Sequence, residues 1–123
     1  MNSLTELKKI IQSLNEQITD NDIASFQNEL LLLRKKFKNN QILSTFFRMM
    51  QSLGRYLGSK KSSAHIDSIP ILNSIVQQVE KIISHPNLKG DEIKKILSTE
   101  IQKYKSLKNS IASKTVVSTE DIS

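Results

Sequence analysis

The residue types best able to carry chemistry are sparse in this sequence. It contains two histidines, His65 and His85, and no cysteine. The absence of cysteine excludes disulfides, thiolate nucleophiles and zinc sites built on thiolates. Two histidines so far apart, with no neighbouring pair of carboxylates, do not supply the ligands that a metal site needs. Both are expected at helix ends, where an imidazole most often caps the helix or interacts with its dipole.

The acidic and hydroxyl residues form no catalytic pattern either. Asp20, Asp22, Asp91 and Glu92 fall at expected helix starts, where carboxylates favour the free amides and the positive end of the dipole. No two acids share an apolar stripe, so nothing predicts an acid–base pair. The sequence has no G-x-S-x-G elbow and no glycine-rich phosphate loop. We therefore expect no enzyme, and no catalytic residue, cofactor, metal or small-molecule substrate.

The clearest positive signal is a long stretch without acidic residues. The formal net charge of the chain is +6, and residues 30–66 contain no Asp or Glu. The eight basic residues of this stretch are Arg34, Lys35, Lys36, Lys38, Arg48, Arg55, Lys60 and Lys61. Such a surface would suit an acidic partner, either a nucleic-acid backbone or an acidic protein face. The alternative is a solvated face with the usual cations at two helix C-termini, which antiparallel helices would place at opposite ends.

Two apolar doublets, Phe46-Phe47 and Met49-Met50, lie at the centre of the segment 42–61. Neighbouring residues on a helix point about 100° apart, so both members of a doublet are buried only if the helix is central or a partner covers one side. Core packing is the ordinary interpretation. The other is that these four residues bind a protein partner or a second copy of the chain, since methionine surfaces adapt to varied ligands.

Gly54 and Gly58 lie four residues apart, on one face of the same expected helix. Glycine within a helix costs about 1 kcal/mol relative to alanine, so a reason for its presence is expected. We expect Gly54 to permit the close approach of a neighbouring helix. Gly58 is expected to end the helix.

The elements that must position these residues are five helices. Apolar residues recur at steps of three and four, which predicts amphipathic helices over about 3–18, 20–38, 41–57, 68–84 and 91–112. Short connections favour antiparallel neighbours. The prediction is an all-α, single-domain, five-helix antiparallel bundle over 1–112, with four up-down helices and one end helix packed across them. The periodicity is lost at 113–123, which predicts a flexible, disordered tail.

The chain is expected to be cytoplasmic. Its first residues, MNSLTELKKIIQSLNEQ, lack the uninterrupted apolar stretch of a signal peptide. No window reaches the roughly 18 apolar residues that a membrane span requires, so we expect no membrane partner.

Residues 48–112 carry several short motifs in a characteristic order. Leu-Gly-Arg-Tyr-Leu at 53–57 precedes a lysine-rich loop, His-x-Asp-Ser-Ile-Pro at 65–70, His-Pro at 85–86 and Lys-Lys-Ile-Leu at 94–97. This order resembles helical segments that accompany receiver domains in bacterial two-component proteins. The resemblance implies a signalling or scaffold module without chemistry of its own. The chain lacks the strand–helix alternation and acidic phosphoacceptor cluster of a receiver, so any such partner would be a separate protein.

Two functional hypotheses follow. The first is a non-catalytic interaction or regulatory module in bacterial signal transduction, acting through an apolar helix face and oligomerisation. The second is a nucleic-acid-binding protein that uses the basic residues of 30–66. Neither hypothesis identifies a particular partner, because the sequence indicates only the chemistry of the surface.

Overall fold

The computed structural model describes the backbone of residues 4–122 and the side chains of residues 4–112. These residues form helices and no strand, in the order α1 (Thr5–Glu16), α2 (Asp20–Lys36), α3 (Gln41–Lys60), the short 3-10 helix η1 (Lys61–Ser63), α4 (Ser68–Ser84) and α5 (Gly90–Ile122). The expected all-α fold of five α-helices is confirmed. No helix in this described part combines the length and the apolarity needed to cross a membrane.

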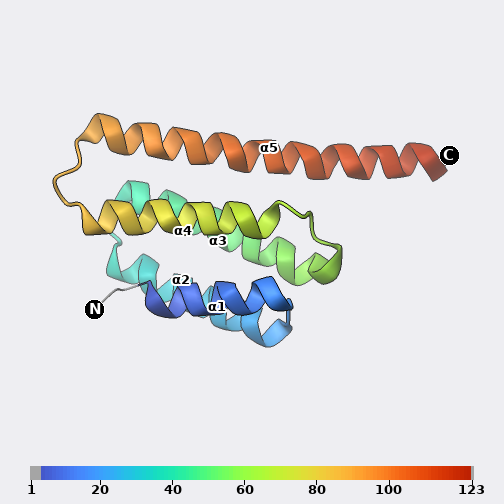
Figure 1. Cartoon of the computed structure of the whole chain (residues 1–123), viewed down its shortest axis with the longest axis horizontal. Coiled ribbons are helices and arrows are strands. Elements are labelled where there is room, and N and C mark those ends of the chain that lie inside the picture. Colours follow the sequence, from blue (N-terminus) through green and yellow to red (C-terminus); the bar gives the residue numbers. More distant parts are fainter. Residues whose placement is uncertain (1–3, 123) are drawn as a thin grey trace.

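The first four helices form a closed ring. Each packs on the next, and α1 also packs on α4. Successive helices run in opposite directions, and α5 lies along α4 and also contacts α3 (Figure 1). The C-terminal part of α5 extends beyond the other helices in this view. The tail expected at 113–123 falls on residues whose side chains lie outside the described part of the chain.

Helix α3 is the centre of the core. Its buried residues are Leu43, Phe46, Phe47, Met49, Met50, Leu53, Gly54 and Leu57. Helix α2 covers it on one side, and α4 and α5 cover it on others. Both members of the Phe and Met doublets are therefore buried by the chain itself, with Met49 the most exposed at 7%. These four residues are core residues in this fold, and they present no surface to a partner.

Two short polar side chains fix where helices begin. The Thr19 hydroxyl accepts a hydrogen bond from the Asp22 amide at 3.1 Å, which caps α2. The Asn40 side-chain oxygen accepts from the Leu43 amide at 3.0 Å and caps α3. The connection between α2 and α3 is short, because only residues 37–39 separate the end of α2 at Lys36 from Asn40, which caps α3.

Helix α3 passes through Gly58 and ends at Lys60, so the expectation that Gly58 ends the helix is wrong. A Cβ at Gly58 would lie 3.2 Å from Cγ2 of Ile23 on α2. Its small size therefore matters for helix packing rather than for ending the helix.

The residue after α3 has an unusual backbone conformation. Lys61 has φ 48° and ψ −120°, and it is the one non-glycine residue with positive φ among those described. A side chain strains this conformation, typically by about 1–3 kcal/mol. The Lys61 ammonium lies 2.9 Å from the carboxylate of Asp20, which is largely exposed.

We expect Lys61→Gly to be more stable than Lys61→Ala by about 1 kcal/mol. Both variants remove the ion pair with Asp20, and only glycine relieves the backbone. The difference is smaller than the full strain because glycine also gains freedom in the unfolded chain. Urea denaturation followed by circular dichroism measures it, provided that the m value is unchanged. Equal stabilities of the two variants would show that Lys61 is not strained.

Candidate functional site

Both histidines serve helix ends, as expected. The Asp67 amide donates to Nδ1 of His65 at 3.1 Å, immediately before α4. At the other end of α4, Nδ1 of His85 lies 3.0 Å from the carbonyl oxygen of Lys81, to which its N–H donates. In the described residues, no three or more His, Cys, Asp or Glu side chains gather where they could hold a metal ion.

One acidic residue is buried among those that the structure describes. Glu100 of α5 is only 1% exposed. Ser74 of α4 donates to Oε1 of Glu100 at 2.5 Å, and the Lys103 ammonium lies 2.9 Å from Oε2. The same ammonium donates to the Ser74 hydroxyl at 3.0 Å. Glu100 and Lys103 thus form an ion pair within α5, as their i, i+3 spacing favours. The hydrogen bond from Ser74 to Oε1 links α5 to α4, whereas Oε2 is buried beside the Lys103 ammonium and accepts no hydrogen bond.

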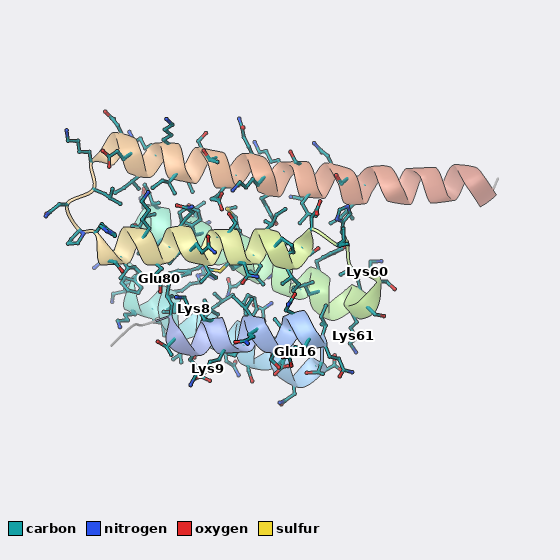
Figure 2. All side chains as sticks on the ribbon, viewed as in Figure 1. Lys8, Lys9, Glu16, Lys60, Lys61 and Glu80 are labelled. Atoms are coloured by element: carbon teal, nitrogen blue, oxygen red, sulfur yellow. The ribbon has the colours of Figure 1, made fainter. Side chains whose placement is uncertain are left out.

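The lysines of the acid-free stretch lie at opposite ends of the bundle. Lys35, Lys36 and Lys38 lie at the C-terminal end of α2, and Lys60 and Lys61 at that of α3. Figure 2 shows Lys60 and Lys61 away from the end where Lys8 of α1 pairs with Glu80 of α4. The expected separation of these charges by antiparallel helices is confirmed. Lysines at these positions suit the negative end of each helix dipole, which accounts for them without a ligand.

The arginines are arranged differently. The chain has three, Arg34, Arg48 and Arg55. Nη1 of Arg34 donates to the side-chain oxygen of Gln51 at 2.8 Å, which brings this α2 residue onto the middle of α3. Arg48 and Arg55 precede and follow Gln51 by about one helical turn. All three guanidinium groups therefore belong to one face, which we call the arginine face.

Arg48 and Arg55 are the accessible members of the arginine face. They are seven residues apart, so they project in similar directions about 10.5 Å apart along the helix axis. Both are exposed. Within residues 4–112, no hydrogen bond or ion pair engages either guanidinium group. Because no acid occurs in 30–66, their sequence neighbours do not neutralise them either.

A groove of about 290 Å³ adjoins the arginine face, between α3 and α5. Its walls are largely apolar, and they include Leu53, Tyr56, Tyr104, Leu107, Ile111 and Ala112. Ser52 and Lys108 also line it. Ser52 lies one turn after Arg48, so the groove borders the arginine face along α3 without including the arginines in its lining.

Helix α5 adds positive charge beside this groove. Lys105 and Lys108 are exposed, and residues 101–119 contain no acid. The Lys108 ammonium lies 5.3 Å from the centroid of the Tyr104 ring. The sequence analysis did not find this site, because the groove depends on α5 lying beside α3. The second acid-free stretch, on α5, was the signal that could have pointed to it.

The chain matches no protein-family model, and comparison with curated proteins and with solved structures finds no match either. The resemblance of residues 48–112 to helical segments of two-component proteins therefore stays a prediction. The candidate site rests on its own geometry.

Proposed function

We propose that this chain is a non-catalytic module that binds nucleic acid, with phosphate groups held on the arginine face. One observation carries the proposal: Arg48 and Arg55 are exposed on the same side of α3 and engage no partner within the described residues. A guanidinium group is always charged and matches two phosphate oxygens at once, whereas an ammonium acts as a point charge. Three arginines on one face therefore support phosphate binding better than scattered lysines do.

The hypothesis of an apolar interaction surface has less support. It relied on Phe46, Phe47, Met49 and Met50, and all four are buried within the chain. A partner could reach them only after α2, α4 or α5 moved away. The arginine face needs no such rearrangement, because its two outer members are already exposed.

The test is binding of a fluorescently labelled single-stranded 20-mer and its duplex, measured by anisotropy at 50 and 200 mM salt. We expect a dissociation constant of about 10⁻⁴–10⁻⁶ M at physiological salt, and tighter binding at low salt. The variant Arg48→Gln/Arg55→Gln should bind at least ten-fold more weakly at low salt. Its log–log salt dependence should be shallower by about 1.4–1.8, because two phosphate contacts are lost.

The matched control is Lys9→Gln/Lys89→Gln, which removes two charges at exposed positions outside the arginine face. It should bind nearly as well as the native chain. Absence of binding at low salt would refute the proposal, as would equal losses in the two double variants. Displacement of the oligonucleotide by poly-glutamate at the same charge concentration would instead favour an acidic protein as the partner.

A further inference from the structure

The two tyrosines of the chain meet in one place. They are Tyr56 on α3 and Tyr104 on α5, and both line the groove beside the arginine face. Each is half-buried, so part of each side chain stays accessible. The Tyr56 hydroxyl accepts a hydrogen bond from the His65 amide at 2.8 Å, which fixes the orientation of its ring. The groove therefore offers aromatic surface that is already held in position.

The size and lining of the groove select the kind of occupant. Its volume of about 290 Å³ is at the lower end of small-molecule pockets, which are roughly 300–1,000 Å³. Such a space suits one planar ring system better than a whole peptide helix. Leu53, Leu107 and Ile111 give it apolar walls, while Lys108 supplies a cation. An occupant with a flat apolar ring joined to negative charge fits both properties.

We infer that this groove receives an unpaired base, so that the arginine face binds single-stranded nucleic acid in preference to duplex. The inference rests on the proposed function and specifies its ligand. Proteins that bind single strands combine a positively charged track along the backbone with aromatic side chains on which bases stack. In a duplex the bases are stacked inside the helix, and extruding one costs a few kcal/mol.

The test uses the fluorescence of the protein itself. The chain has no tryptophan and its two tyrosines both line the groove, so tyrosine emission reports on this site directly. Three ligands of equal length are compared: oligo(dT), a duplex, and an abasic single strand that keeps its phosphates and lacks bases. We expect oligo(dT) to quench tyrosine emission and to bind at least ten-fold more tightly than the abasic strand. Oligo(dU) and oligo(rU) serve as further arms: they differ only in the sugar, so the tighter binder of these two identifies the preferred sugar.

Two variants separate stacking from other effects. Tyr104→Leu removes the ring and should weaken oligo(dT) binding about ten-fold or more. Its affinity for the abasic strand should stay unchanged, which a merely unfolded variant would not achieve. Tyr104→Phe keeps the ring and should bind oligo(dT) within about two-fold of the native chain.

The outcomes distinguish this inference from the proposed function. If the duplex and the abasic strand bind as tightly as oligo(dT), and tyrosine emission does not change, the inference is wrong while phosphate binding on the arginine face stands. If none of the ligands binds at low salt, both fail. The comparison of ligands uses the native chain alone, so it decides the matter even if Tyr104→Leu fails to fold.

Discussion

Replacing Phe47 with alanine is expected to lower the free energy of unfolding by about 3–5 kcal/mol. Phe47 is fully buried at the centre of α3, and its ring centroid lies 6.3 Å from that of Phe37 in a tilted arrangement. Truncation loses the transfer free energy of the ring and leaves a cavity, because a central helix cannot shift to fill it. About 0.5–1.5 kcal/mol of this loss comes from the aromatic contact with Phe37.

Urea denaturation of the purified variant measures this loss, with Phe47→Leu as a milder companion. Phe47→Leu keeps an apolar side chain and should lose less than half as much stability, so it stays measurable even if Phe47→Ala is unfolded. Leu31→Ala is the control at an exposed apolar position, since Leu31 is 48% exposed, and it should change stability little. A loss below about 1 kcal/mol for Phe47→Ala would mean that the ring is not part of the core. The hypothesis of an apolar partner surface would then regain its support.

Gly54→Ala is expected to destabilise the chain by about 1–3 kcal/mol, although alanine is the better helix former. A Cβ at this position would lie 2.4 Å from Nε2 of Gln27 and 2.9 Å from the ring of Phe26. Gln27 could swing away, at the cost of its hydrogen bond to the Gln51 carbonyl oxygen, but Phe26 is fully buried and cannot. Helices α2 and α3 would have to separate.

Gly58→Ala is the matched control on the same helix face. Its nearest contact would be 3.2 Å, to a methyl group of Ile23, so its stability should stay within about 1 kcal/mol of the native chain. Combining Gly54→Ala with Phe26→Leu should cost less than the sum of the two changes, because the smaller side chain makes room. Thermal unfolding of the native chain, Gly54→Ala, Phe26→Leu and the double variant measures the coupling energy between the two positions. A Gly54→Ala variant more stable than the native chain would show that the two helices do not approach closely there.

The helical fold was predictable because its signals are local. Apolar spacing predicts the helices: α2 begins at Asp20, directly after its capping residue Thr19, and α4 runs from Ser68 to Ser84, as expected. The role of Gly54 also followed from sequence, since a costly residue in mid-helix needs a packing reason. The end of α3 was not predicted: the helix continues through Gly58 to Lys60, and Gly58 lies where a Cβ would meet Ile23 of α2.

The candidate site was predicted only in part. The acid-free stretch contains all three arginines, but their gathering depends on a contact between helices, from Arg34 to Gln51. The groove depends on α5 lying beside α3, and no local pattern specifies that pairing. The burial of Glu100 had a signal that was overlooked, because this residue falls within the apolar spacing of Ile93, Ile96, Tyr104 and Leu107.

The attachment of α5 has a consequence for how the molecule opens. Among its described side chains, only Glu100 and Leu107 are buried, whereas the ring of α1 to α4 holds nearly all of the core. Although further apolar residues of α5 pack against the core at its surface, we expect α5 to detach as a cooperative unit at a free energy below that of global unfolding. Its backbone amides would then exchange with solvent sooner than those of α3. Because α5 forms one wall of the groove, ligand bound there would slow that exchange, coupling occupancy to local stability.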